Sequence, residues 1–493
     1  MKSSSELFDL IKSLSSSEKR YFRLSASVQK GNKKYLKLFD LLDSQKIFDE
    51  RKLRSAKGSE SIFRNYNFTK NYLGKLIFKS LLNYKNEKST DAKLFNILQR
   101  CRILFDKALF GQYFKTVKAG RLLAEKNERF SFLLDFIEIE RQLSKKEILS
   151  GMDINKNFDD ELRVLEKISV INSYKRVIAL LFRFYRYKGI VRSAADEEEL
   201  NGILSLPQSV SGGKNLTVTS SERKLFLQSL ASEIKGDFGS SFSFNKQRYR
   251  LILKNRNIFG ETLFDNFKDS MLSASLSAAD CGNFRDAYKI ISELKSMSVT
   301  SQVNDININL TDLSIKILSA LKGKTKIGID TLMADAEKYL DDYRNKITIN
   351  TFNLTVFRLS SIYFFEEKYS EALRIMEKFN LEKNSRMSPF IEPYSRMLLI
   401  LINFELKKYK LLSYMIPTAR KYLKSRNALH KTEYTVLNYT AKLIKEKKSA
   451  DDNFLLYDLK NELEVLKKER FEKNAFLYFD YLRWIKNKLI IKK

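Results

Sequence analysis

The stretch that decides the fold runs from residue 353 to residue 379 and reads NLTVFRLSSIYFFEEKYSEALRIMEKF. Its apolar residues recur every three or four positions on both sides of residues 366–368, which predicts two helices joined by a tight turn. Tyr369 opens the second helix, and Ala372 follows within its first turn. We expect the aromatic ring to fill the gap between the helices and the small alanine to let them approach closely. The stretch therefore predicts an antiparallel helix pair.

The same pattern recurs at residues 282–287, where Gly282 reverses the chain, Phe284 follows two positions later and Ala287 is the small residue. Two weaker copies replace the small residue; one contains Gly111, Tyr113 and Thr116, and the other contains Tyr409 and Leu412. The aromatic positions 113, 284, 369 and 409 are separated by multiples of about 40–43 residues. This period predicts two further turns, near residues 323–328 and 448–452.

The recurrence resembles the tetratricopeptide-type helix pair, in a degenerate form whose period is longer than the usual length of about 34 residues. The resemblance covers four turns and is absent from residues 1–100 and 200–250. It implies an all-α fold, namely a tetratricopeptide-like α-solenoid of antiparallel helix pairs with an N-terminal helical cap, and a concave groove for a protein or peptide partner. An irregular helical domain is the alternative. Residues 19–23 (KRYFR) are also similar to the openings of large uncharacterised bacterial helical proteins, which implies no activity.

The rest of the chain also has helical character, because it contains four prolines and its 16 glycines mostly separate amphipathic segments. Ser-x-x-Glu capping boxes predict helix starts at Ser3, Ser15 and Ser144. The apolar residues of 175–188 form two stripes, which predicts a helix buried on two faces. Alternating apolar residues in 306–310 and 347–352 fit either strands or extended segments that lead into helices, and we favour the second interpretation.

Changes in composition predict four regions. Residues 1–100 form a basic helical bundle or cap, 101–204 a first half of helical repeats, 205–245 an irregular excursion or boundary containing one helix, and 246–493 a second half of tetratricopeptide-like repeats. In the first region, helices are expected over 6–14, 18–24, 34–42, 49–56 and 62–84. The helices around Gly58 also fit a helix-turn-helix arrangement, whose reading residues would be Arg64, Asn65, Asn67, Lys70 and Asn71. We favour a cap that shields the first repeat.

The chain of 493 residues is strongly basic, with 90 Lys and Arg against 59 Asp and Glu, a formal net charge of +31 and a pI near 9.7. The excess is concentrated at the ends, since residues 1–100 contain 22 basic and 10 acidic residues and residues 401–493 contain 22 and 11. These basic end regions predict contacts with phosphates or another anionic surface. The alternative is that the excess of lysine and arginine reflects compositional bias and a solvated surface, without a binding site. The candidate anion or nucleic-acid contacts are Lys19, Arg20, Arg23, Lys33, Lys34, Lys37, Lys407, Lys408, Lys410, Arg420, Lys421 and Lys424.

Few residues carry catalytic or metal-binding chemistry. His430 is the single histidine, and Cys101 and Cys281 are the two cysteines, which excludes a disulfide framework and a multi-histidine metal centre. We expect His430 to be a surface or capping residue and both cysteines to be buried packing residues. The acidic run at residues 196–199 fits the first turn of a helix better than a cation site. No phosphate-binding loop or nucleophile elbow occurs, so we expect no catalytic residue, cofactor or metal.

The longest apolar run, residues 397–402, is far shorter than the about 20 residues of a membrane-spanning helix. We therefore expect no membrane span, and the lack of an apolar leader favours a cytoplasmic protein. Three functions remain. The favoured one is a non-catalytic scaffold or adaptor that binds a protein or peptide in a concave groove. A nucleic-acid binder that uses both basic ends comes second, and an enzyme built only from carboxylates comes third.

Overall fold

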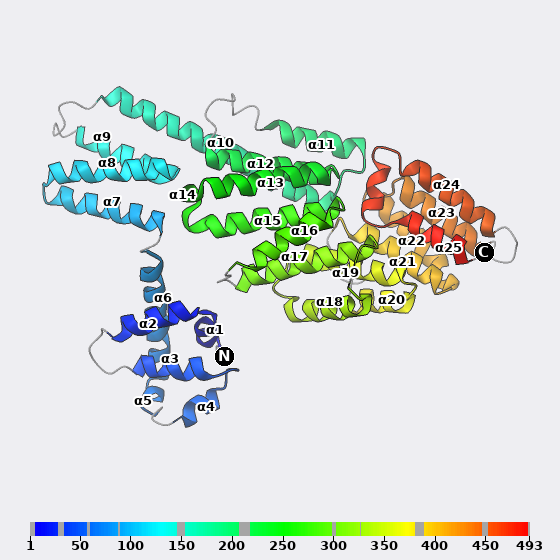
Figure 1. Ribbon diagram of the computed structural model, residues 1–493, viewed down its shortest axis with the longest axis horizontal. Helices are drawn as coiled ribbons and strands as arrows, with labels where there is room; N and C mark the ends of the chain where they lie inside the picture. Colours follow the sequence, from blue (N-terminus) through cyan, green and yellow to red (C-terminus); the bar gives the residue numbers. More distant parts are fainter. Residues whose placement is uncertain are drawn as a thin grey trace. The chain divides into compact units, whose positions relative to one another are not determined.

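A computed structural model describes residues 5–27, 34–56, 60–86, 89–144, 153–206, 217–297, 302–325, 327–379, 389–445 and 452–491. Every regular element within these residues is a helix (Figure 1). The all-α prediction is therefore confirmed for the described part of the chain. Several predicted features lie outside it, namely the cap at Ser3, the contact at Lys33, the break at Gly58, residues 207–216 of the expected excursion and most of the turn expected at 448–452.

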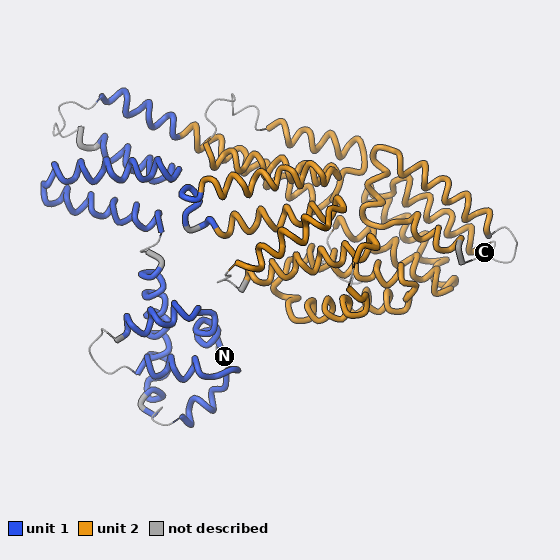
Figure 2. The backbone as a smooth tube through the Cα atoms, viewed as in Figure 1, with its two compact units in different colours: residues 1–164, 256–263, 299–302 blue, residues 165–255, 264–298, 303–493 orange. Residues whose placement is uncertain are grey.

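The chain divides into two compact units (Figure 2). Unit 1 contains residues 1–164, 256–263 and 299–302, and unit 2 contains residues 165–255, 264–298 and 303–493. Both units are assembled from separate stretches of the sequence.

Unit 1 begins with six helices around one apolar core. They are α1 (Glu6–Ser13), α2 (Ser16–Ser27), α3 (Lys34–Ser44), α4 (Glu50–Ser55), α5 (Glu60–Phe63) and α6 (Tyr66–Asn86). The capping box predicted at Ser15 is present, because the Glu18 carboxylate accepts from Ser15 N at 2.8 Å and the Ser15 hydroxyl accepts from Glu18 N at 3.3 Å. Phe39 is fully buried at the centre. The single helix expected over 62–84 is two helices, since a turn at residues 64–65 separates α5 from α6.

The remainder of unit 1 consists of α7 (Thr90–Asp106), α8 (Phe110–Lys126), α9 (Phe130–Ser144), the first part of α10 (Ile154–Lys188), α14 (Arg256–Phe259) and the 3-10 helix η2 (Gly260–Thr262). α8 packs against both α7 and α9. Arg129 ties this group to α14, because its Nη1 donates to the Ile258 carbonyl at 2.7 Å. Ser144 is the last residue of α9, and the helix predicted to start there would begin in residues 145–152, which lie outside the described residues.

Unit 2 contains the remaining helices. Its first part has the rest of α10, α11 (Ala194–Ser205), α12 (Val218–Ile234), α13 (Phe238–Lys254), α15 (Leu263–Asp280), α16 (Phe284–Lys295), α17 (Gln302–Leu321) and α18 (Ile329–Tyr343). Its second part has α19 (Ile349–Phe365), α20 (Tyr369–Lys378), α21 (Glu392–Glu405), α22 (Tyr409–Ser425), α23 (Lys431–Lys445), α24 (Asp452–Leu466), the 3-10 helix η3 (Glu472–Leu477) and α25 (Tyr481–Ile491). One apolar core extends from α17 to α25.

Eight turns between helices of the described residues share one backbone conformation. In each, the helix is followed by a residue with positive φ. The amide of this residue donates to the carbonyl of the third residue before it. The amide of the following residue donates to the carbonyl of the fifth residue before itself. These two hydrogen bonds satisfy carbonyl groups that otherwise lack a partner at the end of a helix. The positive-φ residues are Ala108, Glu128, Gly236, Gly282, Gly323, Glu367, Lys407 and Asn427. The turn expected near residues 323–328 is thus present at Gly323.

At six of these turns, an aromatic residue stands two positions after the positive-φ residue and begins the next helix. These residues are Phe110, Phe130, Phe238, Phe284, Tyr369 and Tyr409. The placement agrees with the expectation for Phe284, Tyr369 and Tyr409. The two small residues, Ala287 and Ala372, are fully buried, which is the close approach that the sequence pattern predicts.

The fourth copy of the turn lies earlier than expected. Gly111 is inside α8 and is not a turn residue, since the chain reverses at Ala108 and Phe110 begins the helix. Tyr113 is a buried residue one turn further along α8. The expectation followed the glycine, whereas the chain uses an alanine at a left-handed position, which costs an L-residue only about 1–2 kcal/mol.

The structure corrects two other expectations, the extended segment at residues 306–310 and the two buried stripes of residues 175–188. Residues 306–310 lie within α17, where Ile306, Ile308 and Leu310 are all buried, so their alternation reflects a helix packed on several sides and not an extended segment. In α10, Leu181 is fully buried on the first predicted stripe, but the stripes are not buried throughout, because Phe182 is exposed. Periodicity cannot distinguish a second buried face from an exposed apolar one.

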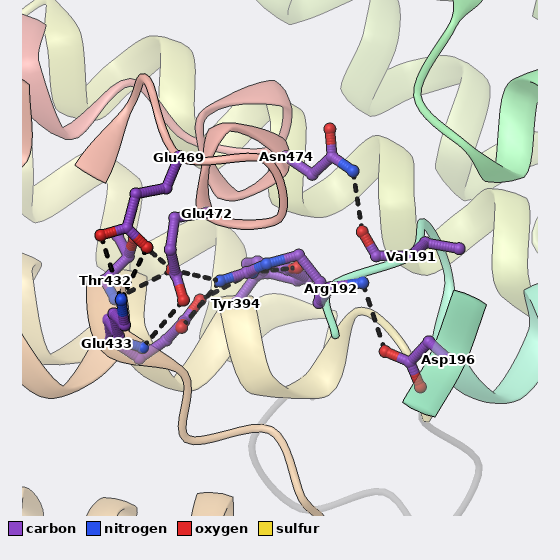
Figure 3. A network of polar contacts seen from close by, with 10 residues as sticks. Val191, Arg192, Asp196, Tyr394, Thr432, Glu433, Glu469, Glu472 and Asn474 are labelled. Carbon is purple, nitrogen blue, oxygen red and sulfur yellow. Dashed lines mark hydrogen bonds and ion pairs between the residues drawn. The ribbon is translucent and has the colours of Figure 1, made fainter. Parts of the chain in front are cut away.

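A buried ionic cluster joins distant parts of unit 2 (Figure 3). Arg192, between α10 and α11, forms a bidentate ion pair with the Glu433 carboxylate on α23, with N–O distances of 2.9 and 3.0 Å. It also donates to the Tyr394 hydroxyl on α21 at 2.8 Å and to Glu472 of η3 at 3.2 Å. The side chains of Arg192 and Glu433 are only 4% and 2% exposed. Glu472 in turn accepts from the amide and hydroxyl of Thr432.

None of the described helices is long and apolar enough to cross a lipid bilayer.

Candidate functional site

A groove runs along α21 in unit 2. It has a volume of about 440 Å³, and residues of α20, α21 and α22 line it. The floor comes from α21, where Ser395, Leu399 and Asn403 follow at intervals of four and so share one helix face. The groove therefore depends on three consecutive helices of the chain and on the tight turn at Lys407 that places α22 beside α21.

Two polar atoms on the floor are buried without a partner. Among the described residues, neither the Ser395 hydroxyl nor Asn403 Oδ1 has a hydrogen-bond partner. The Asn403 amide nitrogen is engaged, because it donates to the Leu399 carbonyl at 2.8 Å and thereby fixes the orientation of the side chain. A buried polar group that lacks a hydrogen bond costs about 1–3 kcal/mol.

The wall formed by α22 exposes apolar and aromatic surface. Tyr414 is 68% exposed, and Leu411 beside it is exposed as well. Leu373 of α20 lines the opposite side, and Met415 lies deeper on the α22 side. Large exposed apolar side chains gathered around a hollow are typical of interaction sites, whereas single ones scattered over a surface are not informative.

The two ends of the groove differ in charge. Glu392 stands at the start of α21 and binds Arg396 at 2.8 Å, and the Arg396 guanidinium lies 4.0 Å from the centre of the Tyr422 ring. Burial and the nearby Glu392 carboxylate raise the pKa of Tyr422 to about 12, so its hydroxyl stays protonated. Lys408 lies just after α21 ends, at the other end of the groove.

A second hollow continues from the Lys408 end. Lys407, Lys408 and Lys410 line it, together with Tyr409, Leu411 and Tyr414. Three of the predicted anion contacts are therefore brought together beside the groove. The other three lie further along α22: Lys421 and Lys424 are exposed, and Arg420 is half-buried and its Nη2 donates to Asn438 Oδ1 at 3.0 Å.

The predicted contacts of the N-terminal region belong to unit 1, and two of them are engaged in ion pairs. Lys19 binds Asp43 at 2.7 Å, and Arg23 binds both Asp40 and Asp43 at 3.0 Å. Arg20 and Lys37 are exposed, and Lys34 is half-buried at the first position of α3. The ion pairs reduce the positive charge that this surface offers to a phosphate.

The remaining singled-out residues take structural positions. His430 immediately precedes α23, and burial with the nearby Arg192 charge lowers its pKa, so the imidazole is neutral at neutral pH. Cys101 is buried as expected, and burial raises its pKa to about 11. Cys281 is exposed, so the expectation of burial is wrong for it. The acidic run at 196–199 lies in α11, and Ser193 caps that helix by accepting from Asp196 N, as a helix start requires.

Sequence reasoning located the lysines of this site but missed its floor and wall. Ser395, Leu399 and Asn403 carry a signal, namely polar residues at a four-residue spacing in an otherwise apolar helix. Nothing local marks Tyr414 or Leu411, because their exposure follows from how α22 packs. No family model matches the chain, and neither does a curated protein or a solved structure.

Proposed function

We propose that this protein is a non-catalytic helical-repeat scaffold that binds an extended segment of a partner protein in the groove formed by α20, α21 and α22. The observation that carries the proposal is the exposed apolar and aromatic wall of the groove, formed by Tyr414 and Leu411. The side chains of a bound peptide can cover both residues.

The proposal includes a tetratricopeptide-like solenoid for the part of unit 2 from α15 to α22. The positive-φ residues Gly282, Gly323, Glu367 and Lys407 stand 41, 44 and 40 residues apart, and each joins two successive helices. A regular period of helix pairs supports a repeat array, in which stacked repeats present a continuous groove. The period is longer than that of the tetratricopeptide repeat, so the likeness is one of architecture.

The charges at the ends of the groove specify the peptide further. α21 has 14 residues and is therefore about 21 Å long, a distance that about six extended residues cover. The Lys408 end, extended by Lys407 and Lys410, complements a carboxylate. Glu377 at the other end complements a basic group, whereas Glu392 there is already paired with Arg396. We therefore propose a segment with an acidic residue at one end, a basic residue at the other and an apolar residue between them.

The test is a selection of random octapeptides displayed on phage, followed by fluorescence polarisation titration of the enriched peptides as synthetic probes. We expect Tyr414→Ala to weaken binding at least tenfold, since covering an aromatic side chain stabilises a complex by about 1.5–3 kcal/mol. The matched control is Tyr187→Ala on α10, because Tyr187 is 58% exposed and lies outside the groove. Equal affinity of the wild-type chain and Tyr414→Ala for every enriched peptide would contradict the proposal.

The second candidate is nucleic-acid binding through the basic end regions, and one observation favours it: Lys407, Lys408, Lys410, Lys421 and Lys424 are all exposed in unit 2. Binding to phosphates weakens steeply with salt, because counterions are released on association. Titration with a fluorescent single-stranded oligonucleotide at two salt concentrations distinguishes the two candidates. A steep salt dependence that is insensitive to Tyr414→Ala would support this second candidate instead.

A further inference from the structure

Unit 2 contains another cavity, of about 510 Å³, which shares no lining residue with the groove. Much of its wall is aromatic, with Tyr185, Phe357, Phe365, Phe476 and Tyr478 among the lining residues. Phe365 and Phe479 stack nearby at 5.0 Å, and Tyr478 stacks on Tyr394 at 4.1 Å, so the aromatic rings belong to a packed frame. The cavity is large enough for a small organic molecule.

Helix C-termini converge on this cavity. Glu233 and Asp280 stand at the ends of α12 and α15, and Leu321 is the last residue of α17. The C-terminal end of a helix carries partial negative charge, because its last carbonyls lack partners within the helix. Two of the lining cations are engaged with such carbonyls: Lys322 Nζ donates to the Asp280 carbonyl, and Arg483 Nη1 donates to the Leu321 carbonyl at 2.9 Å.

The three lining acids are not equivalent. Asp480 accepts from the Arg483 amide at 3.1 Å as a helix cap. Asp280 has Arg358 as its counter-ion at 3.7 Å. Glu233 has no ion pair among the described residues, and its side chain shares a hydrogen bond with Tyr185. Among the described residues, Glu233 and Asp480 are thus the lining acids without an ion pair, and of the two Asp480 is already engaged as a helix cap.

We infer that this cavity binds a small organic cation, an alkylammonium or quaternary ammonium group on an apolar body, with Glu233 as its counter-ion. The aromatic residues make the walls apolar, which suits the body of such a ligand, and one of these rings, Phe365, already has the Arg483 guanidinium 4.4 Å from its centre. This site stands apart from the peptide groove and does not depend on the proposed scaffold function.

The protonation of Glu233 gives the inference a measurable signature. Burial raises the pKa of Glu233 to about 7, the Asp280 charge adds to the effect, and Arg358 opposes it. The groups that face Glu233 are Tyr185 from α10, Asp280 from α15 and Arg358 from α19, and burial raises the pKa of both Tyr185 and Asp280. Tyr185 therefore stays neutral near pH 7. A cation that pairs with the Glu233 carboxylate displaces its proton to solvent.

The experiment is isothermal titration of the full chain with benzyltrimethylammonium, whose charge does not change with pH. With a pKa of about 7, about one eleventh of Glu233 is ionised at pH 6 and about ten elevenths at pH 8. We therefore expect the affinity for benzyltrimethylammonium to rise about tenfold from pH 6 to pH 8. Titrations in buffers of different ionisation enthalpy measure the proton released at pH 6. Benzoate serves as the anionic counterpart and is expected not to bind.

Variants separate the role of Glu233 from general effects on the fold. Glu233→Gln keeps the shape and removes the charge, and we expect it to weaken benzyltrimethylammonium binding at pH 8 about tenfold or more and to abolish the pH dependence. Glu366→Gln, an exposed acid outside the cavity, is expected to change neither quantity. If Glu233→Gln does not fold, proton release by the wild-type chain tests the same point. Benzoate binding in place of the cation, no binding of the cation, or cation binding without proton release would each overturn the inference.

Discussion

At the scale of single residues, Arg192 holds together segments that are up to 280 positions apart in the sequence. Its guanidinium is buried between Glu433, Glu472 and Tyr394. A buried ion pair adds little stability compared with apolar residues of the same volume, but removal of one partner leaves buried charge without compensation. The cluster therefore makes the arrangement of these segments specific.

We predict that Arg192→Met lowers the free energy of unfolding by about 3–5 kcal/mol, because Glu433 and Glu472 lose their counter-ion inside the protein. The measurement is urea unfolding near neutral pH. Arg470→Met is the control, since Arg470 is 71% exposed and its ion pair with Glu197 lies at the surface. We expect that change to cost less than about 1 kcal/mol. Similar effects of the two substitutions would contradict the role given to Arg192.

Unlike the charged Arg192, the Glu233 carboxyl contributes most to stability when it is neutral. Burial raises its pKa from 4.5 to about 7, so between these values the folded protein keeps a proton that the unfolded chain releases. Stability therefore falls as the pH rises from about 4.5 to about 7 and stays reduced above that. The difference between the two pKa values corresponds to a loss of at most about 3 kcal/mol in the free energy of unfolding.

We predict that Glu233→Gln raises the free energy of unfolding at about pH 8 by up to about 3 kcal/mol and changes it little at about pH 4. Urea unfolding at both pH values measures the difference. Glu366→Gln provides the comparison, because Glu366 is exposed. An effect of Glu233→Gln that is equal at both pH values would show that folding does not raise the pKa of the Glu233 carboxyl, which contradicts its burial as a protonated group.

At the scale of elements, the shared turn is set by backbone conformation more than by residue type. Gly282 has φ of 87°, and a Cβ added there meets nothing within 4 Å. Only the left-handed backbone therefore resists a side chain at this position. We predict that Gly282→Ala lowers the free energy of unfolding by about 1 kcal/mol or more.

Gly202→Ala is the matched substitution, because Gly202 lies inside α11 and a Cβ there also meets nothing within 4 Å. Alanine is favoured over glycine within a helix by about 1 kcal/mol, so this change is expected to stabilise the protein. The two Gly→Ala variants should thus differ in sign when their urea unfolding is compared. The same sign for both would contradict the conformation assigned to the Gly282 turn.

Local signals predicted most of the helices but not all of the turns. The helix starts near Ser15 and Phe284 follow from a capping box and from a glycine turn, both of which act within a few residues. The turn at Ala108 was misplaced because alanine carries no turn signal, and a glycine three positions later drew the prediction to Gly111. The alternation in 306–310 was ambiguous because a helix buried on several sides has no polar face.

At the scale of the whole molecule, the sites depend on packing that no local pattern reveals. The lysines at 407, 408 and 410 were predictable from charge, but the floor residues Ser395 and Asn403 become a site only when α20 and α22 flank α21. The same holds for Glu233, whose neighbours Asp280 and Arg358 are supplied by other helices.

Partner binding in the groove along α21 can be tested by affinity purification of the tagged chain from its native cell, at low and moderate salt, each with and without nuclease. The wild-type chain is compared with Tyr187→Ala and with the groove variant that combines Leu411→Glu and Tyr414→Ala. We predict that the same partner protein remains bound to the wild-type chain and to Tyr187→Ala in all four conditions and is lost from the groove variant. Partners that disappear with nuclease or salt, or that the groove variant retains, would contradict the claim that the groove along α21 binds a protein segment.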